Sequence, residues 1–502
     1  MLSRRGRGNY FIKPDYRARL DNQYFIDITT KDLVFQPEVY ELVDYLAERS
    51  GATHIIDVGA GNGLKLKPLT EKYKLIAIDH KSNMDELRSN LPGHQCLEAD
   101  LEKGLPRLPK NILKKSIVVS ADVIEHLKRP DKYLQDLAHL SHQVPFLLLS
   151  TPDRVRVRGI GDCGPPGNPA HVREWSLEEL YSLLANYGFA GLMAGYTINT
   201  NQHRRKSTSL LISGTDVYHE NHGSKVEQKA IQAIITLYND AEIIDQVIDH
   251  LLQQGVDVHI VDNWSSDGGY ELVKSKSAKT TGLSYERYPI KKPKYYEWEK
   301  LLLRVDDIAA EGSYDWYLHH DADELRLSPW PGISLRQAIS FVDSRGYNAL
   351  DFTVLDFRPT KDGFGKEGKL EEFFTHCEFG KRPGHFVQKK AWKSAGKKVG
   401  LAETGGHEVI FENRRTYPLK FITKHYPLRG TKQAQRKIFS ERLPRLSPAE
   451  KKKGWHIHYD SFGQKDNFIW PEEMLLQFYP PTFFAEYLVE LISGIGVNRT
   501  KT

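Results

Sequence analysis

The sequence has few cysteines and no long apolar runs. Its 502 residues include three cysteines, Cys96, Cys163 and Cys377, which lie far apart. This spacing excludes a disulfide framework and a cysteine-based zinc site, and it fits a reducing compartment. No apolar stretch approaches the ~20 residues that cross a bilayer, and the N-terminus has no secretory apolar region. We therefore expect a cytoplasmic protein.

The sequence also lacks a strong excess of charge of one sign. Its 70 Lys and Arg residues against 65 Asp and Glu residues leave a formal net charge of +5. That excess is too small for a chain of this length to indicate nucleic-acid binding, and no basic stripe with interleaved aromatic residues is present. We therefore expect no nucleic-acid partner.

Length and composition favour a globular protein with more than one core. Hydrophobic residues make up 40% of the chain and charged residues 27%, as in ordinary globular proteins. Because 502 residues exceed the usual span of one domain, we predict two domains, at 1–215 and 229–445. The polar segment 216–228 has no hydrophobic period and is the predicted linker. Residues 446–502 are the predicted C-terminal helical tail.

A glycine-rich turn follows the first predicted strand. A helical pattern begins at Gln36, and a buried strand is expected at 53–58. The strand ends in a turn that contains Gly59, Gly61 and Gly63. Glycines suit a turn that a cofactor crosses, because side chains there would collide with it. The spacing is Gly-X-Gly-X-Gly and differs from the Gly-X-Gly-X-X-Gly that is typical of dinucleotide-binding turns.

Further strands and acidic residues follow this turn. We predict a helix at 64–72 and a strand at 75–78 that ends at Asp79. An acid at the end of a second strand can accept both ribose hydroxyls of a nucleoside. Later strands are expected before Asp100, at 117–120 and at 146–150. Alternating strands and helices of this kind predict a parallel sheet with right-handed crossovers.

Residues 36–212 resemble class I S-adenosylmethionine-dependent methyltransferases. The resemblance rests on the glycine turn, Asp79, the Asp100 position, Val123–Leu127 (Val-Ile-Glu-His-Leu) and His171–Ser176 (His-Val-Arg-Glu-Trp-Ser). It implies a Rossmann-like fold with S-adenosyl-L-methionine as cofactor, in which the glycines line the methionine and ribose, Asp79 holds the ribose and Asp100 faces the adenine. By the same resemblance the cofactor-binding residues are Asp57, Gly59, Gly61, Gly63, Asp79, Asp100 and Asp122.

Two histidines are candidates for the base of the methyl transfer. Transfer to a hydroxyl needs a group that takes the acceptor proton, and histidine titrates near neutrality. His126 closes the Val-Ile-Glu-His-Leu segment, and His171 opens the segment after the fifth strand. The alternative is that both are packing or hydrogen-bonding residues.

The second domain begins with its own strand and helix pattern. A buried strand is expected at 230–238, and Asn239 and Asp240 are suited to cap the amphipathic helix after it. The strand 256–261 leads to Asp262, and a turn of Asn-Trp-Ser-Ser-Asp-Gly follows, whose acid is Asp267.

An aromatic strand then runs into a cluster of charge at Trp316–Glu324. Asp321 and Asp323 flank one small residue, and in an extended segment they would point to the same side. Their oxygens suit a divalent cation that bridges nucleotide phosphates and neutralises a leaving diphosphate. The alternative is a solvated acidic turn.

With these segments the second domain resembles the GT-A glycosyltransferases near the inverting family-2-like group. The resemblance implies a GT-A nucleotide-diphospho-sugar transferase fold and a Mn²⁺ or Mg²⁺ cofactor. Asp262 would face the donor base, Asp321 would contact the donor and Asp323 the metal. The predicted nucleotide-sugar-binding residues are Asp240, Asp262, Asp267 and Asp321, and the predicted metal ligands are Asp321, Asp323 and His425, the last from a His-Tyr-Pro segment.

The acceptor-side base of the sugar transfer is less defined. The usual Glu-Asp pair of family-2-like enzymes is absent, and Leu401–Glu408 presents two carboxylates and an imidazole in a flexible turn. An inverting transfer needs one base to deprotonate the acceptor hydroxyl. We rank Glu403 and His407 together and Glu408 behind them.

The leading hypothesis is a bifunctional α/β enzyme of surface-glycan synthesis. It would combine a methyltransferase with a glycosyltransferase that moves a sugar from a nucleotide-sugar donor to a glycan or lipid-linked saccharide acceptor. The main alternative makes the second domain a non-catalytic glycan-binding module, and a nucleic-acid or protein methyltransferase has less support. The amphipathic stretch 483–492 could dock on the catalytic domain, form a dimer contact or lie peripherally on the inner face of a membrane.

Overall fold

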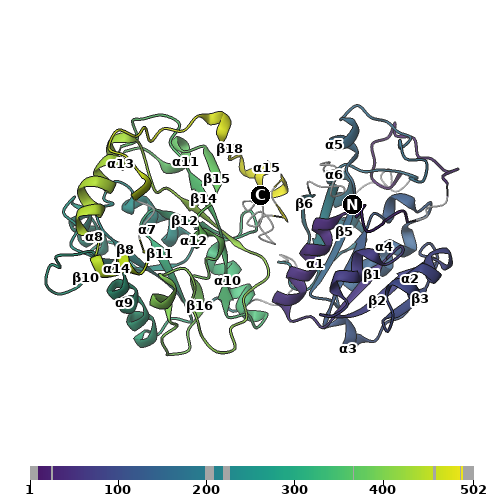
Figure 1. Cartoon of the computed structure of the whole chain (residues 1–502), viewed down its shortest axis with the longest axis horizontal. Coiled ribbons are helices and arrows are strands. Elements are labelled where there is room, and N and C mark those ends of the chain that lie inside the picture. Colours follow the sequence, from purple (N-terminus) through teal and green to yellow (C-terminus); the bar gives the residue numbers. More distant parts are fainter. Residues whose placement is uncertain are drawn as a thin grey trace. The chain divides into compact units, whose positions relative to one another are not determined.

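The computed structural model describes residues 9–23, 27–197, 208–218, 226–365, 367–455, 460–486 and 488–489. The chain divides into two compact units, of which the second is Ser224–Tyr479 and the first comprises the rest (Figure 1). This boundary falls inside the predicted linker. The predicted tail is divided, because its part up to Tyr479 belongs to the second unit while helix α15 (Pro480–Glu486) packs on β6 of the first. Part of the predicted 483–492 stretch lies outside the described residues.

The first unit is built on a seven-stranded sheet in the order β3-β2-β1-β4-β5-β7-β6. The strands from β3 to β5 in this order are parallel, as the sequence predicts, whereas β7 and β6 are antiparallel additions. The order reverses between β1 and β4, and the glycine turn follows β1 at that point. The strands are β1 (His54–Val58), β2 (Lys74–Asp79), β3 (Gln95–Glu98), β4 (Ser116–Ala121), β5 (Phe146–Pro152), β6 (Met193–Thr197) and β7 (Thr208–Ser213).

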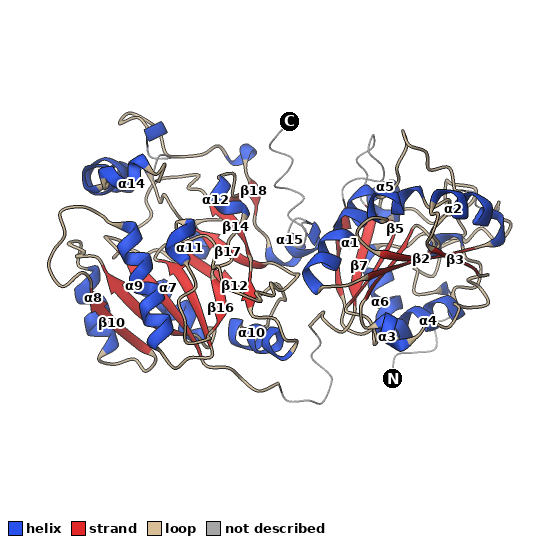
Figure 2. Cartoon of the chain, turned by 60° about the horizontal axis from the view of Figure 1, so that its bottom comes forward, coloured by secondary structure: helices blue, strands red, loops and turns tan. Residues whose placement is uncertain are grey.

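Helices lie on both faces of this sheet (Figure 2). Helix α1 begins at Pro37, and Gly51 ends it with a left-handed φ of 69°, as expected for a C-terminal glycine. Ser176 and Glu179 form a capping box at the start of α6. The helices are α1 (Pro37–Ser50), α2 (Met84–Asn90), α3 (Lys110–Leu113), α4 (Asp131–Ser141), α5 (Arg154–Arg158) and α6 (Leu177–Tyr187).

The helix predicted at 64–72 is wrong in type and length. The segment forms only a short 3₁₀ helix, Leu64–Leu69, which contains Pro68. Proline has no backbone N–H, and its ring clashes with the carbonyl four residues earlier, so the α-helix does not propagate. The glycine turn is therefore followed by a tight connection and not by a long helix.

The second unit contains a six-stranded sheet in the order β10-β9-β8-β11-β16-β13. Strands β10, β9, β8 and β11 are parallel, and β16 is antiparallel to β11. The order reverses between β8 and β11. The strands are β8 (Ile231–Leu237), β9 (Asp257–Asp262), β10 (Leu283–Arg287), β11 (Trp316–Asp321), β13 (Ala349–Leu350) and β16 (Ala391–Lys393); the longer helices are α7 (Ile244–Gln253), α8 (Gly269–Ser277), α9 (Trp298–Glu311) and α10 (Leu335–Ser344).

A second sheet in this unit has the order β12-β17-β14-β15-β18. Its strands are β12 (Glu324–Leu327), β14 (Phe352–Phe357), β15 (His376–Phe379), β17 (Phe421–His425) and β18 (Leu476–Gln477). Short helices accompany it: α11 (Leu370–Phe373), α12 (Pro383–Phe386), α13 (Thr431–Gln435), α14 (Pro448–Lys452) and a π-helix at Arg436–Arg442.

The Asp-X-Asp segment joins the two sheets of the second unit. β11 ends at Asp321, β12 begins at Glu324, and Ala322 and Asp323 form the turn between them. The prediction of an extended segment with both carboxylates on one side is therefore wrong. The two carboxylates approach a common space because the chain turns from one sheet into the other.

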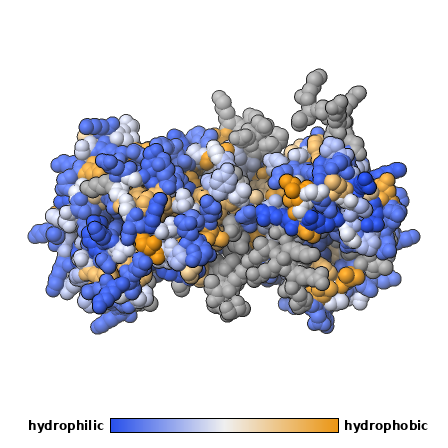
Figure 3. All heavy atoms as spheres, turned by 90° about the horizontal axis from the view of Figure 1, so that it is seen from above, coloured by the Kyte–Doolittle hydropathy of each residue, from blue (hydrophilic) through white to orange (hydrophobic). Residues whose placement is uncertain are grey.

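The surface carries mostly polar side chains. The face shown in Figure 3 is largely hydrophilic, with small, scattered hydrophobic areas. Among the described residues, the longest apolar helices fall short of what a membrane crossing requires.

Candidate functional site

The glycine turn of the first unit has the backbone that the sequence predicts. Gly59, Gly61 and Gly63 have φ values of 85°, 59° and 81°, in the region that other residues avoid. A Cβ on Gly59 would lie 2.3 Å from a methyl carbon of the Val123 side chain. The turn lies at the carboxyl end of β1, where the strand order reverses, and open α/β sheets bind ligands in that position.

Two of the predicted acids support this turn. Asp79, buried at the end of β2, accepts hydrogen bonds from the backbone N–H of Gly61 (2.7 Å) and His80 (2.6 Å) and from the Asn83 side chain (2.8 Å). Asp57 lies in β1 and accepts a hydrogen bond from the Tyr40 hydroxyl (2.8 Å). Burial raises the pKa of Asp57 to about 7. Asp79 thus ties the end of β2 to the glycine turn.

The other two acids predicted to bind the cofactor, Asp100 and Asp122, have different neighbours. Asp100 follows β3, and its pKa is lowered by the Lys103 ammonium, which lies 3.0 Å away. Asp122 follows β4 with a left-handed φ of 55°, and its Oδ1 accepts a hydrogen bond from Gln36 Nε2 at 3.2 Å. Burial raises the pKa of Asp122. Both acids lie after strands β3 and β4, at the edge where the glycine turn is found.

The segment before α1 covers the turn, which sequence reasoning missed. The carboxylate of Asp27 accepts the backbone N–H of Asn62 (3.0 Å), and the Asn62 side chain donates to the Thr29 carbonyl (2.7 Å). A Cβ on Gly61 would meet the Asp27 carboxylate at 2.0 Å. No hydrophobic period marks this segment, so only the fold could place it.

The two histidines proposed as bases lie together. Their ring centroids are 4.8 Å apart, with the rings edge to face. Burial, with a smaller effect of the neighbouring His171, lowers the pKa of His126 to about 3. His126 Nδ1 lies 3.0 Å from the Ala170 carbonyl oxygen, and His171 Nδ1 lies 2.6 Å from Glu174 Oε1. His126 is therefore neutral at pH 7 and a weak base.

Comparison with known proteins identifies part of the first unit. A family model described as a methyltransferase domain matches residues 35–193. Residues 35–193 form a class I S-adenosylmethionine-dependent methyltransferase domain. The matched range begins just before α1 and ends in β6, so it contains the glycine turn and both histidines. Because it ends at residue 193, this match says nothing about the second unit.

Curated relatives agree with this domain assignment. Two proteins from strains of Mycobacterium tuberculosis, each named a probable S-adenosylmethionine-dependent methyltransferase, are 30% identical to this chain over 146 residues. A similarly named protein of Mycolicibacterium smegmatis is 27% identical over 147 residues. The first two matches cover 29% of this chain and 51% of each relative. The chain thus spans about half the length of the curated relatives it matches.

Solved structures of methyltransferases also align with part of the chain. A SAM-dependent methyltransferase from Aquifex aeolicus is 21% identical with a TM-score of 0.26, covering 36% of this chain and 89% of that structure. The methyltransferase domain of bacterial CtHen1 is 17% identical with a TM-score of 0.27, covering 35% and 97%. The assignment of the methyltransferase domain rests on the family match and on its strand order.

The second unit contains a cavity of about 640 Å³. It lies at the carboxyl ends of β8 and β11, where the strand order reverses. Five of the residues predicted from the sequence line it: Asp240, Asp321, Asp323, His407 and His425. Residues that sequence reasoning missed also line it, among them Glu324, Arg382, His385, Lys390, Lys437 and Arg442. The cavity therefore combines carboxylates, imidazoles and cations.

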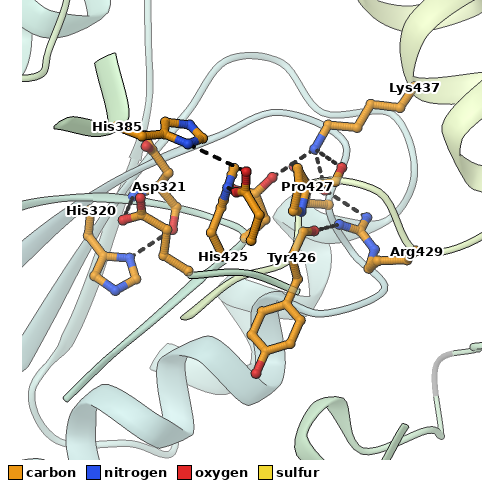
Figure 4. Close-up of polar contacts among 12 residues, drawn as sticks. His320, Asp321, His385, His425, Tyr426, Pro427, Arg429 and Lys437 are labelled. Atoms are coloured by element: carbon orange, nitrogen blue, oxygen red, sulfur yellow. Dashed lines mark hydrogen bonds and ion pairs between the residues drawn. The ribbon is translucent and has the colours of Figure 1, made fainter. Parts of the chain in front are cut away.

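Each carboxylate of the Asp-X-Asp segment is paired with a lysine. Asp321 Oδ2 lies 2.7 Å from Lys390 Nζ, and Asp323 Oδ2 lies 2.8 Å from Lys437 Nζ. Figure 4 shows Asp321, His425 and Lys437 in this part of the unit. Burial alone would raise the pKa values of both acids, but the lysines hold them well below their usual range. Both acids are thus ionised. The lysines come from distant segments, next to β16 and in the π-helix, so their sequence context gave no signal.

His425 is held by a second carboxylate. Its Nδ1 lies 2.6 Å from Asp356 Oδ1, and its Nε2 lies 3.6 Å from Asp323 Oδ1. His385 Nδ1 approaches the other oxygen of Asp356 at 3.4 Å. Burial alone would raise the pKa of Asp356, but the two rings hold it well below its usual range. Asp356 therefore orients the His425 ring towards the Asp-X-Asp turn.

Asp240 lines the cavity but is held in an ion pair. Its Oδ1 lies 2.8 Å from Arg429 Nη2, and Arg429 also contacts Glu242 at 2.9 Å. The Lys437 ammonium is 3.9 Å from Asp240. Asp240 therefore positions cations at the wall of the cavity, a role that the sequence did not indicate.

Four other predicted residues lie outside the cavity lining. Asp262 is fully buried and pairs with Arg287 Nε at 2.9 Å, while Asp267 accepts the backbone N–H of Ala241 at 2.8 Å. Glu403 is exposed, and Glu408 pairs with Lys389 and Arg414, each at 2.7 Å. Of the three acceptor-side candidates, His407 is the one that faces the cavity.

Proposed function

We propose that the first unit transfers a methyl group from S-adenosylmethionine to a hydroxyl of a saccharide. The observation that carries the methyl-transfer part is the glycine turn at the reversal point of the sheet, inside the matched methyltransferase range. A Cβ on any of the three glycines would lie within 3 Å of a neighbouring side chain, so the turn must remain free of side chains of its own. Gly59, Gly61 and Gly63 would line its methionine and ribose portion, and Asp79 and Asp100 its nucleoside portion. The saccharide acceptor follows from the proposal for the second unit.

We propose that the second unit is a GT-A glycosyltransferase. What supports this is the cavity at the carboxyl ends of parallel strands, with an Asp-X-Asp turn and several cations in its wall. The cations suit the diphosphate of a nucleotide-sugar donor. The acceptor would be a glycan or a lipid-linked saccharide, and one domain's product would serve as the other's substrate.

We propose that Asp321, Asp323 and His425 would hold a divalent cation such as Mn²⁺ or Mg²⁺. The lysines contact the Oδ2 atoms of the two aspartates, and His425 Nε2 lies 3.6 Å from Asp323 Oδ1. A carboxylate behind a ligating histidine, as Asp356 stands behind His425, fixes the ring orientation of a metal ligand. When bound there, the cation would neutralise charge on the leaving diphosphate.

His407 is the residue that we propose as acceptor-side base of the sugar transfer. Burial lowers its pKa to about 4, and the Lys390 ammonium adds to this effect. The ring is therefore neutral at pH 7, and it would take the acceptor proton at Nδ1 in place of the hydrogen bond from Gln388. Gln388 Nε2 lies 3.0 Å from His407 Nδ1 and fixes the ring.

Replacing His407 by alanine should lower the rate of sugar transfer by about 10²-fold, the lower end of what a general base contributes. The readout is hydrolysis or transfer of whichever nucleotide sugar the protein accepts. Glu403→Gln is the matched control, because Glu403 is exposed and outside the cavity lining. Equal losses in both variants would remove His407 from this role.

A thermal-shift panel on the intact protein tests both proposals. The ligands are S-adenosylhomocysteine, UDP, GDP, CDP and dTDP, each with and without Mn²⁺. A ligand at ~100 times its Kd stabilises the folded state by about 2.7 kcal/mol, which is a measurable shift in melting temperature. We expect S-adenosylhomocysteine to stabilise without metal, and one nucleotide diphosphate to stabilise only with it. If only S-adenosylhomocysteine acts, the glycan-binding module becomes the better account of the second unit.

A further inference from the structure

Three metal-ligating side chains of the methyltransferase domain meet beside the glycine turn. Glu125, His126 and His171 each offer one ligand atom, and these three atoms lie within 4.8 Å of one another. Glu125 and His126 follow β4, and His171 lies in the connection after β5. Ligand bonds of about 2.0–2.2 Å place atoms on opposite sides of an ion about 4.4 Å apart. Small side-chain rotations would therefore bring the three atoms to coordination distance.

The tautomer of His126 is fixed by its surroundings. Its Nδ1 lies 3.0 Å from the Ala170 carbonyl oxygen, which can only accept a hydrogen bond. Nδ1 therefore carries the proton, and Nε2 of this neutral ring carries a lone pair. A ligating histidine needs this state, with one nitrogen as donor to the protein and the other as ligand.

The tautomer of His171 is fixed in the same way. The backbone N–H of Ala170 donates to Asn168 Oδ1 (3.0 Å), so the Asn168 amide group faces His171 Nε2 at 2.9 Å. Nε2 must accept that hydrogen bond, so it carries the lone pair of the ring, and an ion would take this lone pair in place of the Asn168 amide. Nδ1 then donates to Glu174 Oε1 at 2.6 Å, and Glu174 is itself paired with Arg158 at 2.9 Å. A carboxylate behind the ring is the usual support of a metal-binding histidine.

One carboxylate oxygen of Glu125 is buried and has no hydrogen-bond partner among the described residues. The side chain is fully buried, and its Oε2 accepts the Thr151 hydroxyl at 2.9 Å. Its Oε1 has no hydrogen-bond partner among the described residues. Buried carboxylate oxygens are normally hydrogen-bonded, paired or coordinated to a metal, so this one marks a binding position.

We propose that Glu125, His126 and His171 bind a divalent first-row metal ion at the acceptor side of the methyltransferase domain. One carboxylate and two imidazoles suit Mn²⁺, Fe²⁺ or Zn²⁺ better than they suit Ca²⁺, which prefers sites made only of oxygen ligands. On the proposed methyl-transfer function, the ion would bind the acceptor hydroxyl and lower its pKa, so that neither histidine need act as base. Glu174 and Thr151 are then positioning residues behind the ligands.

Mn²⁺ binding to the full-length protein tests this site. The titration, followed by loss of the free Mn²⁺ signal in electron paramagnetic resonance, is made in an Asp323→Asn, His425→Ala background. These changes remove ligands from both groups of the second unit that could hold an ion. We expect a single tight site, whose affinity falls at least tenfold when Glu125→Gln is added. Glutamine keeps an acceptor for the Thr151 hydroxyl, so the fold should persist. His171→Ala is the second variant, and we expect it to weaken binding as strongly.

The outcomes separate this proposal from the methyltransferase function. Unchanged Mn²⁺ affinity in both variants, or no tight site in the Asp323→Asn, His425→Ala background with or without S-adenosylhomocysteine, would overturn the metal site. His139→Ala is the control, because His139 lies in α4 and outside the cluster. Binding of S-adenosylhomocysteine is measured in parallel by thermal shift, and its absence would count against the methyltransferase function and not against the ion.

Discussion

Replacing Gly59 by alanine is expected to abolish binding of S-adenosylhomocysteine to the methyltransferase domain. The new Cβ would lie 2.3 Å from Val123 Cγ2 and 3.3 Å from its Cγ1, and Val123 is buried. The φ of 85° is also unfavourable for alanine, at a cost of order 1–3 kcal/mol. To relieve both, the turn would move away from the geometry that holds the cofactor. Calorimetric titration of S-adenosylhomocysteine into the variant measures the loss.

The control variant Gly93→Ala separates the effect of the steric clash from the effect of the unfavourable φ. Gly93 has a similar φ of 80°, but a Cβ there would meet nothing within 4 Å. Gly93 follows α2 and is not part of the glycine turn. The control should therefore show a small loss of stability and unchanged binding. If both variants bind S-adenosylhomocysteine like the natural protein, the turn is not where the cofactor lies.

Replacing Asp323 by asparagine is expected to lower sugar transfer by about 10²–10³-fold, the usual effect of removing one electrostatic group at developing charge. Asparagine loses the charge that pairs with Lys437 at 2.8 Å and the oxygen that faces His425 at 3.6 Å. Both the cation and the lysine would then be misplaced. Release of nucleotide from the donor identified by thermal shift is the assay. Methyl-donor binding should be unchanged, because Asp323 belongs to the second unit.

Asp267→Asn is the informative control for this variant. The resemblance to family-2-like enzymes predicts Asp267 as a donor contact, whereas the structure has it accept the backbone N–H groups of Ala241 and Gly269. Asparagine can still accept one of these, so activity should stay within a few-fold. Retained transfer in Asp323→Asn together with a loss in Asp267→Asn would place the donor elsewhere and refute the assigned cavity.

Local patterns in the sequence were enough to predict several strands and the glycine turn. Apolar runs predict β1 and β8 to within a residue or two, because buried parallel strands are almost continuously apolar. The prediction of a helix at 64–72 was wrong because Pro68 prevents an α-helix there, although the apolar residues have a helical spacing. Single residues with a required backbone, such as Gly59, are therefore the most predictable parts of the site.

The cavity of the second unit was predicted only in part. Asp321, Asp323 and His425 stand out by spacing and context, whereas Lys390 and Lys437 look like ordinary surface lysines in the sequence. They reach the cavity because β16 and the π-helix are brought next to β11, and that pairing is a property of the fold. Asp262 was assigned to the donor, but Arg287 neutralises it inside the protein. Such tertiary pairing cannot be derived from local patterns.

The turn at Ala322 and Asp323 has a mechanical consequence. The turn connects β11 of one sheet to β12 of the other. His425 is a residue of β17, which pairs with β12. A ligand held by Asp321 and His425 together would fasten the two sheets to each other across this turn. On the proposed glycosyltransferase function, the spacing between the sheets would then affect how tightly the donor binds. Core substitutions that shift one sheet against the other would then tune affinity from a distance, without touching any residue of the cavity wall.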